Sequence, residues 1–96
     1  MLIDKGVSPG EVVTIKMTTG EEVLAKLVEE KPDGYKITRP MVLSASQQGI
    51  GMMPYIFTVH PDKEFLLNKT AIATVVATEP DFANQYIQST TGIKLA

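Results

Sequence analysis

Residues 12–43 read VVTIKMTTGEEVLAKLVEEKPDGYKITRPMVL, and this stretch decides the fold. Apolar and polar residues alternate along its first part, so that Val13, Ile15 and Met17 fall on one side of an extended chain. This two-residue period is typical of a half-buried antiparallel strand. Glycines follow at Thr19-Gly20 and Asp33-Gly34, where a tight turn needs a residue that tolerates positive φ. The stretch therefore predicts two consecutive hairpins, with strands at 12–18, 22–30 and 35–43.

The following residues predict a loop and two more strands. The segment 44–51 is small, polar and glycine-rich, and we expect a mobile loop there. A fourth strand is predicted at 52–60, with Pro54 marking an edge position or a bulge. A fifth strand is predicted at 65–77, bent around Asn68-Lys69-Thr70. Together with the two hairpins, these strands make a small antiparallel β-meander.

The C-terminal part predicts a short helix. Thr78 is expected to be its N-cap, with Pro80 in the first turn and the acidic Asp81 at the third helical position. Phe82 and Tyr86 then fall along one apolar stripe. Gly92 is the expected stop.

Length and composition exclude several classes of protein. A chain of 96 residues forms one domain, and its net charge of −2 gives no overall basic field for nucleic acid. Cysteine is absent, which excludes disulfides and thiolate zinc sites and fits a cytoplasmic location. The N-terminus lacks the pattern of a signal peptide, and no apolar run approaches the roughly 20 residues of a membrane helix. We expect a cytoplasmic protein with no membrane association.

No pattern of residues indicates catalysis or metal binding. His60, Asp62 and Glu64 alternate and could share a face as metal ligands, but Pro61 breaks the strand geometry between them. The single histidine has no serine at a spacing that suggests a catalytic partner. We therefore expect no catalytic residues, no metal and no cofactor, and predict that the chain is not an enzyme.

The apolar pattern also favours self-association. Leu24 and Val28 lie on the opposite face of their strand from Val23, Ala25 and Leu27, and residues 71–76 are apolar on both sides. A small barrel has only one interior, so the second face needs a cover. The C-terminal helix can supply part of it. A second subunit paired along strands four and five would supply more and would remove the unpaired edges, so we expect a homo-oligomer.

The chain resembles the Sm/LSm family, which includes bacterial Hfq. The spacing Val13-x-Ile15-x-Met17-x-x-Gly20-x-x-Val23-x-Ala25-x-Leu27, followed by Asp33-Gly34-Tyr35, is similar to the first Sm motif. Residues 67–76, LNKTAIATVV, are similar to the Hfq form of the second motif. The resemblance covers roughly residues 11 to 78. It implies a small, strongly bent, five-stranded antiparallel barrel, here with a C-terminal helix. The corresponding division is an N-terminal arm at 1–10, the barrel at 11–78, the helix at 79–92 and a tail at 93–96.

The resemblance also implies a function and a site. Family members join strands four and five of neighbouring subunits into a ring and bind single-stranded RNA around the pore. Carried over to this chain, Tyr35 matches the aromatic residue that stacks on a base, and Lys69 matches the lysine that contacts the base. Asn68 and Thr70 flank Lys69 and would assist. A ring face beside a cation can hold any unpaired base.

Three departures from the family pattern support an alternative. Ile37 stands at the position of the base-reading asparagine, Asn68-Lys69 replaces the Arg-Gly pair of the Sm form, and Thr70 replaces the Hfq histidine. Two functions therefore stay open at this point. One is an oligomeric ring that binds single-stranded RNA at its pore, and the other is a structural or protein-interaction oligomer without RNA binding.

Overall fold

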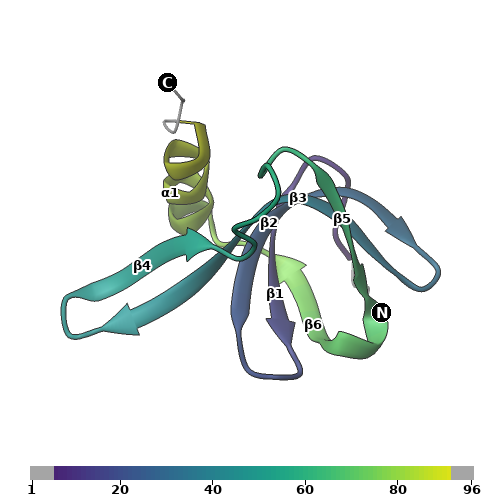
Figure 1. Ribbon diagram of the computed structural model, residues 1–96, viewed down its shortest axis with the longest axis horizontal. Helices are drawn as coiled ribbons and strands as arrows, with labels where there is room; N and C mark the ends of the chain where they lie inside the picture. Colours follow the sequence, from purple (N-terminus) through teal and green to yellow (C-terminus); the bar gives the residue numbers. More distant parts are fainter. Residues whose placement is uncertain (1–5, 92–96) are drawn as a thin grey trace.

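The computed structural model describes residues 6–91 as an antiparallel β-sheet with one C-terminal helix (Figure 1). The elements in chain order are β1 (Val12–Met17), β2 (Glu22–Lys31), β3 (Gly34–Ser46), β4 (Gly49–Pro54), β5 (Glu64–Asn68), the single-turn helix η1 (Lys69–Ala71), β6 (Ile72–Ala77) and α1 (Pro80–Thr91). The expected mainly β architecture with a C-terminal helix is confirmed. The predicted tail at 93–96 and the predicted stop at Gly92 lie outside the described residues.

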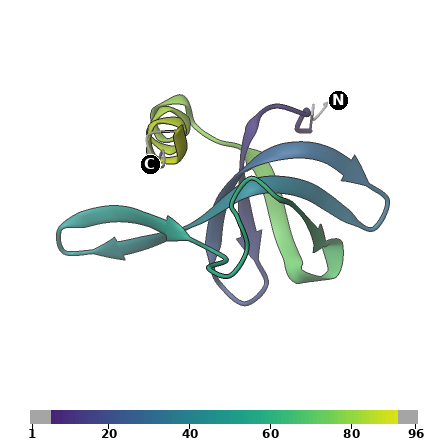
Figure 2. The same ribbon diagram turned by 45° about the horizontal axis from the view of Figure 1, so that its top comes forward.

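The sheet has the strand order β4-β3-β2-β1-β6, and β5 pairs with β3 as well. The long strand β3 uses residues 34–38 to pair with β5 and residues 41–46 to pair with β4. The described chain thus contains six strands in a sheet that is not closed, rather than the five strands of the expected barrel. The second half of β3 and β4 form a hairpin that projects from the rest of the sheet, and we call it the arm (Figures 1 and 2).

The strand boundaries differ from the predicted ones in three places, and the last of these raises the number of strands from five to six. Residues 44–51 were expected to form a loop, but they belong to the arm, where Ser44 pairs with Gly51 and Ser46 with Gly49. Gly49 turns the chain with φ 121°. The strand expected at 52–60 ends at Pro54, and residues 55–63 lie outside the strands. The strand expected at 65–77 is divided at the predicted bend, because η1 separates β5 from β6.

The main core lies on the inner face of the sheet. Its fully or almost fully buried side chains come from β1, β2 and β3, as the alternation predicts: Val13, Ile15, Met17, Val23, Ala25, Leu27 and Ile37. Side chains from β5, η1 and β6 pack against this cluster and cover its open side. The sequence pattern of the first strand thus identified the buried face correctly.

Helix α1 covers part of the outer face, as expected. Tyr86, which is 1% exposed, packs with Leu24 and Met41 in a second buried cluster. The start of the helix differs from the prediction, because α1 begins at Pro80 and places Asp81 at its second position. Thr78 is not the N-cap. Its hydroxyl lies 2.8 Å from that of Thr14 and thereby ties the segment before the helix to β1.

The midpoint of β3 is sharply kinked at Arg39, the described non-glycine residue with positive φ (54°). Three contacts hold this conformation. The Arg39 N–H donates to the Pro61 carbonyl at 2.8 Å, and its Nε lies 2.6 Å from Asp62 Oδ1. The Tyr86 hydroxyl donates to the Arg39 carbonyl at 2.6 Å. The hydrogen bond from Arg39 lowers the pKa of Asp62, and burial raises the pKa of Tyr86, so both contacts persist at neutral pH.

Within residues 6–91, no helix has the length and apolar character needed to cross a membrane.

The hydroxyl of Tyr86 should contribute measurably to stability. Tyr86→Phe keeps the ring in its buried site but leaves the Arg39 carbonyl without this donor, so we expect the free energy of unfolding to fall by about 1 kcal/mol. Urea denaturation followed by circular dichroism measures the change. Tyr55→Phe is the matched control, because this ring is only partly buried, and it should change the value by less than about 0.5 kcal/mol. Equal losses in the two variants would contradict the assigned role of the Tyr86 hydroxyl.

Candidate functional site

The four residues expected to bind RNA lie together at one end of the sheet. The pairing of β3 with β5 places Gly34 opposite Asn68 and Tyr35 opposite Leu67. The Lys69 N–H donates to the Asp33 carbonyl at 2.9 Å and fixes η1 against the turn between β2 and β3. We call Tyr35, Asn68, Lys69 and Thr70 the turn cluster. Two segments more than thirty residues apart in the sequence thus form one surface.

Gly34 makes this close approach feasible. A Cβ atom at this position would overlap the backbone carbonyl oxygen of Leu67 and would come within 3.1 Å of the Leu66 Cδ1 atom. The expectation that Gly34 supplies positive φ at the turn is wrong, because it is absent from the described positive-φ glycines, whereas Gly20 has φ 110°. Its lack of a side chain serves packing between β3 and β5 instead.

Asn68 and Thr70 have a local structural role. The Asn68 side-chain oxygen accepts hydrogen bonds from the Thr70 N–H at 3.1 Å and from the Thr70 hydroxyl at 3.0 Å. Asn68 therefore caps η1, in the manner of an Asx turn. These bonds hold the backbone of Lys69 in place. Asn68 and Thr70 thus act mainly by positioning Lys69. Their hydrogen bonds to each other leave them less suited to binding a ligand.

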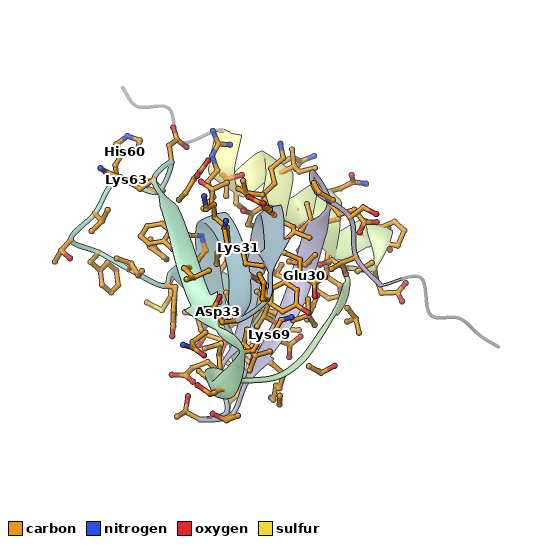
Figure 3. All side chains as sticks on the ribbon, turned by 90° about the vertical axis from the view of Figure 1, so that its right-hand side faces the viewer. Glu30, Lys31, Asp33, His60, Lys63 and Lys69 are labelled. Atoms are coloured by element: carbon orange, nitrogen blue, oxygen red, sulfur yellow. The ribbon has the colours of Figure 1, made fainter. Side chains whose placement is uncertain are left out.

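Lys69 lies between an aromatic ring and a carboxylate. Its Nζ atom is 5.2 Å from the centroid of the Tyr35 ring and 3.0 Å from Glu30 Oε2. Figure 3 shows Lys69 near Glu30 and Asp33, with His60 and Lys63 in another part of the molecule. The side chains of Lys69 and Glu30 are 39% and 50% exposed, so solvent weakens their attraction. The Tyr35 ring is half-buried and packs against the main core.

Sequence reasoning did not identify Glu30 as part of this site. Its pairing partner in the sheet is Tyr35, which brings the carboxylate within reach of Lys69. A two-residue turn at Pro32-Asp33 pairs Lys31 with Gly34 and then Glu30 with Tyr35. The predicted turn therefore contained the information needed to place Glu30 opposite Tyr35.

The site has almost no net electrostatic preference for an anion. Lys31 lies 3.7 Å from Glu29, and Lys69 is paired with Glu30. Ile37, which the resemblance aligns with the base-reading asparagine of the Sm motif, is fully buried and its side chain can offer no hydrogen bond. In the described part of the chain, no three His, Cys, Asp or Glu side chains are arranged to hold a metal ion.

Both strands that flank η1 lie at edges of the sheet. Among the described strands, β5 pairs with β3 alone and β6 with β1 alone. Leu66 on β5 and Val76 on β6 are 51% and 50% exposed. Unpaired edges with exposed apolar side chains are suited to pairing with another chain.

No protein-family model matches this chain, and a search of curated proteins found no significant match.

Gly34 should be intolerant of any side chain. In Gly34→Ala, the added methyl group would push β5 away from β3, and we expect a loss of about 1–3 kcal/mol in the free energy of unfolding, the usual cost of overpacking. Chemical denaturation measures this loss. Gly51→Ala is the matched control, because nothing lies within 4 Å of a Cβ there and its φ is not in the positive range. Similar stability for both variants would contradict the close approach of β5 to Gly34.

Proposed function

We propose that this chain is a subunit of an Sm-like oligomer that binds single-stranded RNA at the turn cluster. The observation that carries the proposal is the approach of the Lys69 Nζ atom to the Tyr35 ring, 5.2 Å from its centroid. A cation beside an aromatic surface is the combination that holds an unpaired base and its phosphate. The two side chains come from the two segments that resemble the Sm motifs.

The ion pair between Lys69 and Glu30 does not prevent this binding. An exposed pair of this kind is worth about 0.2–1 kcal/mol, whereas stacking of a base on an aromatic ring is worth about 1–3 kcal/mol. Lys69 can therefore exchange the Glu30 carboxylate for a phosphate or a base edge at small cost. The rest of the cluster supplies no further cation without a partner, so the affinity for a single subunit is low and depends on several subunits acting together.

Recognition at this site is expected to be tolerant of base identity. The buried Ile37 offers no hydrogen-bonding group, and the Asn68 side-chain oxygen is already bonded to Thr70. Stacking and charge act on every base. Adenine and uracil oligonucleotides should accordingly bind with similar affinities.

Fluorescence anisotropy with labelled oligo-U and oligo-A tests the proposal. Lys69→Ala should weaken binding by about tenfold at low salt, and Tyr35→Ala by about fivefold or more, because one removes the cation and the other the stacking surface. Lys63→Ala is the matched control, since this exposed lysine lies away from the turn cluster (Figure 3) and should leave the affinity unchanged. Glu30→Gln should tighten binding, because it releases Lys69 from its carboxylate partner. Absence of binding by the wild-type protein at low salt would overturn the proposal.

The second candidate is a structural or protein-interaction oligomer without RNA binding. It is favoured by the neutralisation of Lys69 by Glu30 and by the exposed apolar edges of β5 and β6. Both candidates require self-association, and only the first requires the cation to be available.

The oligomer itself can be tested through the edge of β5. Leu66→Lys places a charge on this unpaired edge, and light scattering should report a lower mass than for the wild type, because edge charges oppose strand pairing. Val59→Lys is the control, since this partly exposed valine lies in the segment between β4 and β5 and outside any strand. A wild-type protein that is monomeric at micromolar concentrations would contradict both candidates.

A further inference from the structure

A groove of about 630 Å³ lies on the outer face of the sheet, and none of its lining residues belongs to the turn cluster. It is bounded by the β1–β2 hairpin, the arm, β6 and the first turn of α1. In Figure 1 the arm extends to the left, away from the β1–β2 hairpin, and α1 lies above the arm. We call this feature the outer groove. Its volume falls in the range of about 300–1,000 Å³ that is usual for ligand sites.

The floor and walls of the outer groove are apolar. Leu24 is buried at its base, and three large side chains on its walls are exposed: Ile50 of the arm at 54%, Val76 of β6 at 50% and Phe82 of α1 at 37%. These residues come from separate elements and face one concave surface. Concave apolar surfaces with a polar rim are typical of binding sites.

The rim of the outer groove is acidic. Glu21, Glu22 and Glu79 line it, and Lys16 is the cation among its lining residues. The Thr19 hydroxyl donates a hydrogen bond to Glu21, which lowers the pKa of this carboxyl and keeps it charged. Three carboxylates against one ammonium group favour a cationic ligand and repel nucleic acid.

Four of the cations in the described part of this chain are engaged with carboxylates of the same chain. Lys31, Lys36, Arg39 and Lys69 each already lie within 4 Å of a carboxylate of their own chain. Of the other described cations, Lys16 lies in the outer groove itself, and Lys26 and Lys63 are far apart in the sequence. A second copy would have to exchange such ion pairs to present these cations to the rim, so a partner that is richer in unpaired cations fits the acidic rim better.

We propose that the outer groove docks a short segment of a partner protein that carries alternating apolar and basic side chains. The apolar side chains occupy the space between Ile50, Val76 and Phe82, while the lysines or arginines meet the carboxylates of the rim. This docking site is independent of RNA binding at the turn cluster.

A pair of labelled peptides tests the proposal by fluorescence anisotropy. An alternating leucine–lysine heptapeptide should bind the intact protein, and the matched leucine–glutamate heptapeptide should not. Ile50→Lys should abolish binding, because it replaces an apolar contact by a charge that repels the lysines of the peptide. The double variant Glu22→Gln/Glu79→Gln should weaken binding by about two- to thirtyfold, which is the range expected for removing two exposed charge pairs. Glu29→Gln/Asp33→Asn, at the opposite end of β2, is the control and should leave the affinity unchanged.

Three results would overturn the proposal. The first is equal binding of the two peptides, and the second is equal weakening by the rim variant and the control. The third is no peptide binding together with a fall in the mass of the oligomer in Ile50→Lys, which would identify the outer groove as a contact between copies of this chain.

Discussion

The change of partner along β3 is the constraint on which the rest of the structure depends. One edge of β3 cannot pair with β4 and β5 over the same residues, so the strand divides between them at Arg39. The opposite edge of β3, which pairs with β2, is irregular at the same point: the register between β2 and β3 shifts between Leu24 and Lys26. The segment 55–63 is tied to this kink at both ends, through Tyr55 to the Pro40 carbonyl and through Pro61 to the Arg39 N–H. The kink thereby sets the direction of the arm and the start of β5 together.

The two surfaces described above share this origin but differ in chemistry. The first half of β3 carries Tyr35 and aligns β5, and it thereby brings Lys69 to the aromatic ring. The second half carries the arm, whose residues wall the outer groove. At the turn cluster, positive and negative charges nearly balance around a half-buried ring. In the outer groove, carboxylates outnumber the cation around an apolar floor. Tyr86 connects the floor of the outer groove to the kink, because it packs on Leu24 and donates a hydrogen bond to the Arg39 carbonyl.

The local sequence pattern was sufficient to predict the buried residues wherever a strand has one face toward the core. The alternation Val13, Ile15, Met17 identified the inner face, and Leu24 on the opposite face correctly indicated a need for cover by the helix. The grouping of Tyr35, Asn68, Lys69 and Thr70 came from the resemblance to Sm motifs, and the pairing of β3 with β5 brings these residues together.

The features that escaped prediction depend on partners distant in the sequence. The polar segment 44–51 has Ile50 as its one β-branched residue, yet it is extended because β3 and β4 pair across it. Nothing local marks Arg39 for positive φ, since Pro61, Asp62 and Tyr86 impose it from other segments. The sequence assigned Gly34 to turn geometry because an Asp-Gly pair favours turns. In the structure, glycine is required there because the backbone of β5 passes too close for a Cβ atom.

The pairing of β6 with β1 has a consequence for the order of folding. Strands β1, β2 and β3 follow one another through short turns, so their contacts form between neighbours in the chain. The contact between Thr14 and Thr78 spans 64 positions. The entropic cost of closing such a loop increases only slowly with its length. Contacts between distant segments nevertheless tend to form late and to lower the folding rate. We therefore expect the three-stranded meander to form first and β6 and α1 to assemble on it last, which would leave its apolar outer face open to solvent and to other chains until then.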